Sequence, residues 1–196
     1  MHRRRLLAAA GAAMGALAGC SGGSERTTLE AFAVSSPAME SGDSLPPAHT
    51  CEAEGGGQSP PITIDRVPEP TAGLAVVAEA DLGPINEPVF WSLWNVPPTT
   101  GAIPAGLPRT PTVDALNGAR QGRQSGGEPG YSPPCPPAGT SVELRFQVYA
   151  QREALSASGG ALHDEVVERL QQATLASRRI TVTYRRPSDA GTTADG

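Results

Sequence analysis

Lysine is absent from this chain of 196 residues, and all 15 basic side chains are arginines. Three of them lie at positions 3–5, so the chain after residue 19 carries 12 basic and 20 acidic side chains, a formal charge of about −8. Aromatic residues make up only 4% of the chain, and no stretch after residue 19 gathers arginines with aromatics. Since a negative surface repels phosphate backbones, we expect no nucleic-acid partner.

Motifs of common enzyme classes are missing as well. The chain has no phosphate-binding Gly-x-x-x-x-Gly-Lys loop and no zinc-protease His-Glu-x-x-His helix. The glycines at 55–57 lack the following helix that nucleotide binding needs, and Cys135 has no evident histidine partner for nucleophilic catalysis. His49 and His163 are the only histidines after residue 19, too few for a metal site. We therefore expect no catalysis, metal or cofactor, and we expect both histidines to be ordinary surface or loop residues.

Residues 1–20 have the three parts of an export signal. Arginines at 3–5 form a cationic start, residues 6–17 form an apolar run, and residues 17–20 end it in small side chains. As a helix the run would extend only about 18 Å, short of the roughly 30 Å needed to span a bilayer. We expect residues 1–19 to be removed as a signal peptide and Cys20 to be lipidated, which would anchor the protein to the outer face of the cytoplasmic membrane. The alternative is a secreted protein whose Cys20 is lost with the leader or left as a free thiol.

The remaining cysteines can pair in only one way. If Cys20 is acylated, Cys51 and Cys135 are left, and in an oxidising compartment we expect a disulfide between them. The bridge would close a loop of more than 80 residues and stabilise the fold by at most roughly 4 to 5 kcal/mol. The alternative is two buried free thiols.

The chain after the leader is organised as one β-rich domain. Residues 20–28 form a polar tether, 29–186 the domain, and 187–196 a polar tail that we expect to be disordered. The 20 prolines and 23 glycines cluster between short runs, which favours an all-β sandwich with one or two short helices. Leu162, Val166, Leu170 and Ala173 recur at helical spacing and predict a packing helix with a solvated charged face. The expected strands are 29–34, 62–64, 73–78, 90–96, 142–150 and 180–184.

A series of loop motifs carries a family resemblance. In order, the chain contains His-Thr-Cys at 49–51, Trp-Asn-Val-Pro at 94–97, Gly-Tyr at 130–131 and Pro-Pro-Cys-Pro-Pro at 133–137. Their order and spacing resemble the phosphatidylethanolamine-binding protein family, in its bacterial and archaeal branch of Raf kinase inhibitor-like proteins. The resemblance implies a Greek-key β-sandwich with a small anion-sized pocket at one end.

The pocket motifs of that family are altered in this chain. The Asp-Pro-Asp-x-Pro turn maps to 79–83 and keeps only Asp81, and the histidine before the central tryptophan is replaced by Phe90, beside Trp91. The His-Arg-Tyr run becomes 142–144, which begins at Val142, while Tyr131 is retained. We assign these five residues to the ligand site, although Asp81 can equally cap its own turn. The exchange of arginine for glutamate at 143 adds an opposing charge if that side chain faces the site, but its strand position can turn it to solvent.

The loss of both histidines predicts a degenerate anion pocket that accepts an apolar or neutral group, or nothing. We therefore expect an exported, lipid-anchored binding protein for a small polar or apolar ligand or a lipid headgroup. The alternative is a cell-surface module that interacts with an extracellular protein, such as a protease inhibitor. An open pocket lined by Phe90, Trp91, Tyr131 and Val142 would favour the first, and an exposed apolar patch remote from it would favour the second.

Overall fold

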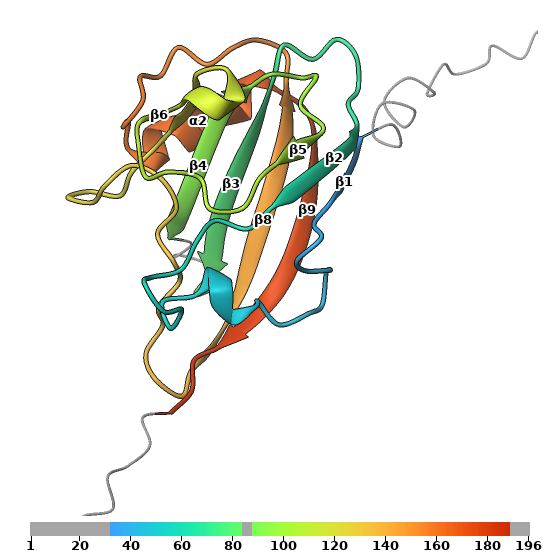
Figure 1. The fold of residues 1–196 in the computed structure, drawn as a ribbon. Helices are drawn as coiled ribbons and strands as arrows, with labels where there is room; N and C mark the ends of the chain where they lie inside the picture. Colours follow the sequence, from blue (N-terminus) through green and yellow to red (C-terminus); the bar gives the residue numbers. More distant parts are fainter. Residues whose placement is uncertain (1–31, 84–87, 189–196) are drawn as a thin grey trace, which may run out of the picture.

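Two antiparallel sheets face each other in the computed structural model, which describes residues 32–83 and 88–188 (Figure 1). The larger sheet has the strand order β6-β7-β4-β3-β8-β9, and the smaller has the order β1-β2-β5. The all-β prediction, with a β-sandwich and one α-helix among the described residues, is confirmed. The elements are β1 Ala33–Ser35, β2 Ile62–Arg66, β3 Gly73–Asp81, β4 Val89–Val96, β5 Ala102–Ile103, β6 Thr112–Val113, β7 Ala119–Gln121, β8 Ser141–Gln151, α2 His163–Ala173 and β9 Thr174–Arg185, with 3-10 turns at Pro47–His49 and Asp114–Leu116.

Five of the predicted runs coincide with β2, β3, β4, β8 and β9. The sixth run, 29–34, overlaps β1, although its residues 29–31 lie outside the described part of the chain. The predicted leader, the tether and tail residues 189–196 also lie outside it. β9 begins earlier in the chain than predicted. Residues 174–179 show no regular apolar pattern, so the sequence did not indicate a strand there, yet they continue the pairing with β8. β5, β6 and β7 were not predicted, since two or three residues are too few to show a period.

The main core lies between the two sheets. Trp91, Phe146 and Leu74 of the large sheet meet Ile62 and Ile103 of the small one, and all five are fully buried. Each such side chain contributes roughly 1.5 to 3 kcal/mol by leaving water. This packing fixes the positions at which the ends of β3, β4 and β8 reach the surface of the domain.

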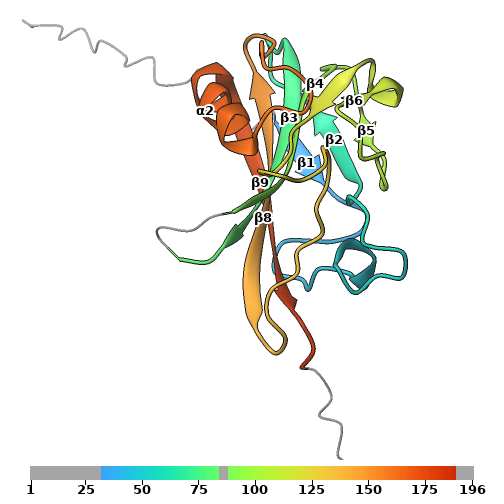
Figure 2. The ribbon, with the colours of Figure 1, turned by 90° about the vertical axis from the view of Figure 1, so that its left-hand side faces the viewer.

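Helix α2 covers the other face of the large sheet (Figure 2). Its Val166, Leu170 and Ala173 pack with Val77 and Trp94 in a second apolar cluster. Leu162, which the sequence placed on this stripe, instead precedes the helix in an extended conformation and is 42% exposed. No helix in the described ranges is long and apolar enough to cross a membrane.

A bulge in β4 puts two successive side chains on the inner face of the large sheet. Ala78 pairs with Trp91 and Glu79 with Val89, so Phe90 has no residue opposite it on β3. Residues of a regular strand alternate between faces, but an extra residue in the ladder breaks this alternation. Phe90 and Trp91 are therefore both part of the core between the sheets.

Candidate functional site

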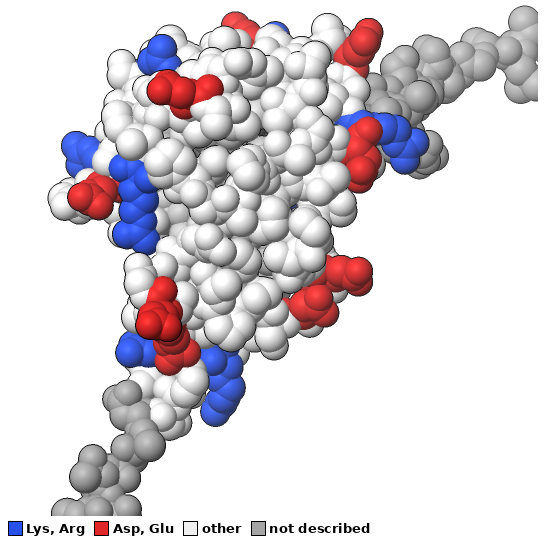
Figure 3. Space-filling view, viewed as in Figure 1, with Lys and Arg blue, Asp and Glu red and all other residues white. Residues whose placement is uncertain are grey.

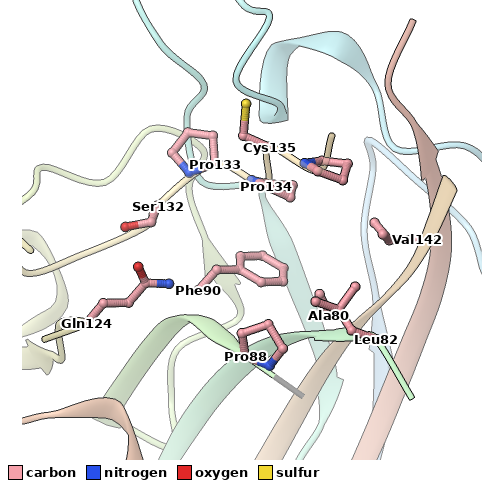
Figure 4. A pocket seen from close by; sticks show the side chains of 11 residues that line it. Ala80, Leu82, Pro88, Phe90, Gln124, Ser132, Pro133, Pro134, Cys135 and Val142 are labelled. Carbon is pink, nitrogen blue, oxygen red and sulfur yellow. The ribbon is translucent and has the colours of Figure 1, made fainter. Parts of the chain in front are cut away.

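A cleft of about 270 Å³ opens where the end of β3 and the start of β4 meet the proline-rich loop (Figure 4). Its wall is largely apolar, and among the described residues only Gln124 and Ser132 bring polar side chains to it. No arginine or histidine of residues 32–83 and 88–188 contributes to it. The lining residues are Ala80, Leu82, Pro88, Phe90, Gln124, Ser132, Pro133, Pro134, Cys135, Pro136 and Val142.

Phe90 and Val142, two of the predicted site residues, both line this cleft. The Phe90 ring lies among the prolines with Val142 across from it (Figure 4), and it packs edge to face on Tyr131 and Phe146, with ring centroids 5.8 and 5.7 Å apart. Such contacts hold the ring in one orientation. At these two positions the cleft therefore has a fixed aromatic surface and a branched aliphatic one.

Trp91 and Tyr131 do not line the cleft, because they lie behind Phe90 in the core. The Tyr131 hydroxyl donates a 2.7 Å hydrogen bond to the backbone carbonyl of His49, and Trp91 Nε1 donates to Gln121 Oε1 at 2.9 Å. Burial raises the pKa of the Tyr131 hydroxyl, which therefore stays protonated as a donor. These two residues support the cleft floor from behind.

Asp81 points away from the cleft. Strand alternation turns Ala80 inward and Asp81 to the opposite face of β3. One carboxylate oxygen of Asp81 accepts the Gly83 N–H at 2.9 Å, which caps its own turn, and the other forms an ion pair with Arg145. Arg145 also contacts Glu79 at 3.8 Å and the half-exposed Glu143 at 3.2 Å. Asp81, which the sequence assigned to the ligand site, thus has the turn-capping role that was left open as its alternative, and Glu143 faces solvent.

The Cys51–Cys135 disulfide is present, as predicted. It joins the loop after the first 3-10 turn to the proline-rich loop, and Cys51 N–H also donates to the Pro134 carbonyl at 3.3 Å. Because Cys135 and its neighbours form one wall of the cleft, the bridge ties that wall to the rest of the domain.

The prediction that His49 and His163 are ordinary surface or loop residues is wrong, because both are buried, each with 4% of its surface exposed. His49 Nδ1 lies 2.9 Å from the Gln58 carbonyl, and His163 Nδ1 lies 2.8 Å from Ser92 Oγ on β4. Burial lowers the pKa of His163 to about 4, an effect that nearby Asp164 only partly opposes. A signal was present in the sequence, since His163 lies three residues before Val166 on the apolar stripe of α2.

Charged side chains are dispersed on the face of the molecule drawn in Figure 3, and the described residues offer no metal-binding cluster. In the view of Figure 3, acidic and basic side chains alternate around the edge and leave the middle of the face uncharged. Across residues 32–83 and 88–188, no cluster of three or more histidine, cysteine or carboxylate side chains is arranged to hold a metal ion.

The described residues thus form a two-layer β-sandwich with a small cleft at one end of its large sheet. A family model described as phosphatidylethanolamine-binding protein matches residues 35–185. The chain belongs to this family, and the resemblance seen in the loop motifs is confirmed.

Relatives support the assignment. UPF0098 protein PH1269 of Pyrococcus horikoshii is 32% identical over 155 residues, covering 78% of this chain and 75% of that protein. "Putative lipoprotein LppC" of Mycobacterium tuberculosis is 29% identical over 205 residues, covering 94% of this chain and 97% of that protein. The crystal structure of E. coli YbcL, described as a member of the mammalian PEBP family, superposes with a TM-score of 0.71 at 28% identity, covering 79% of this chain and 98% of that one.

Proposed function

We propose that this protein is an exported, lipid-anchored binding protein whose remodelled cleft takes a small apolar or neutral ligand. The observation that carries the proposal is the cleft wall itself, in which Phe90 and Val142 face each other and none of the described lining residues is cationic. Charge-assisted hydrogen bonds contribute roughly 1.5 to 3 kcal/mol each, so a wall without them binds phosphate groups weakly. A volume of about 270 Å³ suits a ligand about the size of a single ring.

The two large exposed hydrophobic side chains of the described residues also favour a binding role. Leu82, which is 48% exposed, lies on this cleft, and Leu162 lies on the neighbouring one. An interaction module would instead be favoured by an apolar patch remote from the cleft. We propose no catalytic activity, because the buried Ser92–His163 pair has its hydroxyl fully enclosed, where no substrate can reach it.

Ligand preference is tested by titration with two probes of opposite character. Benzyl alcohol, followed by ¹H–¹⁵N NMR, is expected to cause saturable shifts at the backbone amides of Phe90 and Val142, because its ring matches the apolar wall. Phosphoethanolamine is expected to cause none below millimolar concentration. A micromolar dissociation constant for phosphoethanolamine at these amides would refute the proposal.

Two exposed leucines provide a matched pair of variants for the same titration. Leu82→Ala removes apolar contact surface from the cleft and is expected to cost about 1 kcal/mol, or a roughly fivefold weaker Kd for benzyl alcohol. Leu162→Ala, at a similarly exposed position outside this cleft, is expected to leave that Kd unchanged. Equal effects of the two substitutions would show that the probe does not occupy the cleft.

The lipid anchor is supported by the signal-like leader, by Cys20 at its end and by the relative named as a lipoprotein. Cys20→Ala removes the thiol that would carry the lipid, so the protein is expected to move from the membrane fraction to the soluble exported or precursor fraction. Cell fractionation with immunoblotting measures this, and Ser24→Ala, in the same segment of the chain, serves as the matched control. Membrane retention of the Cys20→Ala protein would argue against lipidation at this residue.

A further inference from the structure

A second cleft, of about 370 Å³, lies beside the first and shares Pro88 and Gln124 with it. It has a different chemical character, because it contains charged and titratable side chains near the start of α2. Its lining residues are Pro88, Val89, Arg123, Gln124, Ser125, Leu162, His163 and Asp164.

His163 brings a buried hydrogen-bond donor to this cleft. The Ser92 hydroxyl is fully buried, and its one hydrogen-bond partner among the described residues is His163 Nδ1 at 2.8 Å. A buried hydroxyl proton needs an acceptor, so Ser92 donates to Nδ1 and the ring proton of the neutral imidazole lies on Nε2. Nε2 is buried and has no partner within the described residues. The ring therefore has an N–H group whose acceptor is missing.

Arg123 lines the same cleft, and its guanidinium donates to the backbone carbonyl of Gln124 at 3.3 Å. Arg123 is held against the start of α2 by two backbone hydrogen bonds, from its N–H to the Ala161 carbonyl and from the His163 N–H to its own carbonyl, at 3.0 and 3.1 Å. No side chain caps the N-terminus of α2, a helix of 11 residues whose first N–H groups carry partial positive charge. Asp164, also in the wall, opposes a ligand of high negative charge.

We infer that this second cleft is a binding site for a carboxylate group, which accepts hydrogen bonds from His163 Nε2–H and Arg123. Among the described lining residues one arginine lies beside one aspartate, and this near balance of charge suits a monoanion better than a phosphate dianion. A carboxylate accepts hydrogen bonds through two oxygens, so it can pair with an N–H group and a guanidinium at the same time. Because Nε2 is buried, a ligand reaches it only if a residue that lines the cleft moves.

The two clefts are adjacent, which indicates where the rest of a bound acid could lie. Because Pro88 and Gln124 border both clefts, an acid with a short apolar tail can place its carboxylate in the second cleft and its tail in the first. This extension rests on the function proposed above, whereas the carboxylate site itself does not.

The test is an NMR titration of the purified protein with acetate and with hexanoate, using chloride at equal ionic strength as the control. Acetate is expected to shift the ring N–H signal of His163 saturably and to leave the ring signals of buried His49 unchanged. Hexanoate is expected to shift the same His163 signal and, in addition, the amides of Phe90 and Val142. If only the His163 signal responds to hexanoate, the apolar extension fails while the carboxylate site stands.

Variants separate the site from general charge effects. Arg123→Gln is expected to weaken acetate binding roughly tenfold by removing a charge-assisted bond. Arg66→Gln, at an exposed position on β2, is expected to have no effect. The inference is overturned if chloride reproduces the acetate shift, if the two arginine variants behave alike, or if the spectra place the His163 proton on Nδ1.

Discussion

Replacement of both Cys51 and Cys135 by serine is expected to lower the free energy of unfolding by about 4 kcal/mol. The bridge joins residues 84 positions apart, and a cross-link over such a long loop strongly restricts the unfolded chain. Urea unfolding of the oxidised protein and of the double variant, followed by tryptophan fluorescence, measures the difference. We expect few other single features of this domain to contribute more to its free energy of unfolding.

The same variant tests the role of the bridge in the cleft. Cys135 lies in the proline-rich wall, so the loss of the bridge is expected to weaken benzyl alcohol binding even under conditions where the domain stays folded. Cys20→Ser is the matched control, because it removes a cysteine outside the bridge. A double variant as stable as the parent protein would mean that the loop contacts alone hold the two segments together.

Acidification is expected to destabilise the domain through His163, by about 3 kcal/mol as the pH falls from about 6.5 to about 4. The pKa of His163 is about 4 in the folded protein, against 6.5 for an unperturbed histidine. In this window the unfolded chain binds a proton that the folded chain does not, so protonation favours unfolding. The stability contribution is fully present above pH 6.5 and is lost as the pH falls toward the folded-state pKa.

A pair of histidine variants isolates this effect from the titration of carboxylates. His163→Gln removes the titrating group, so the difference in unfolding free energy between pH 7 and pH 4 is expected to be smaller than in the parent protein. His49→Gln, at the other buried histidine, leaves the His163 contribution in place. Urea unfolding at several pH values measures both, and an unchanged pH dependence in the His163→Gln protein would contradict the prediction.

Part of the site was predictable because it depends on local sequence. The loop motifs around Trp91 and Cys135 place Phe90 and Val142 where the family has histidines, and both residues line the cleft. The strand pattern predicted β3, β4 and β8 because buried strands of five or more residues have a clear apolar signal. The two remaining cysteines allowed only one pairing.

The direction of individual side chains was not predictable in the same way. Asp81 follows Ala80 on β3, and only the register with β4 and β8 shows that Ala80 faces the cleft while Asp81 faces Arg145. The bulge at Phe90 breaks the alternation of side chains between the two faces for one residue. It was not predictable from β4 alone, because it arises where Phe90 has no residue opposite it on β3.

The sequence by itself determined the β-rich class and the family, because composition, period and motif spacing are local properties of the chain. The tertiary structure alone decided that Tyr131 and Trp91 lie behind the cleft and that His163 is buried against Ser92, 71 residues away along the chain. Burial and pairing between residues so far apart depend on how the sheets and α2 pack against each other. A local sequence pattern does not indicate which partner a polar side chain will contact.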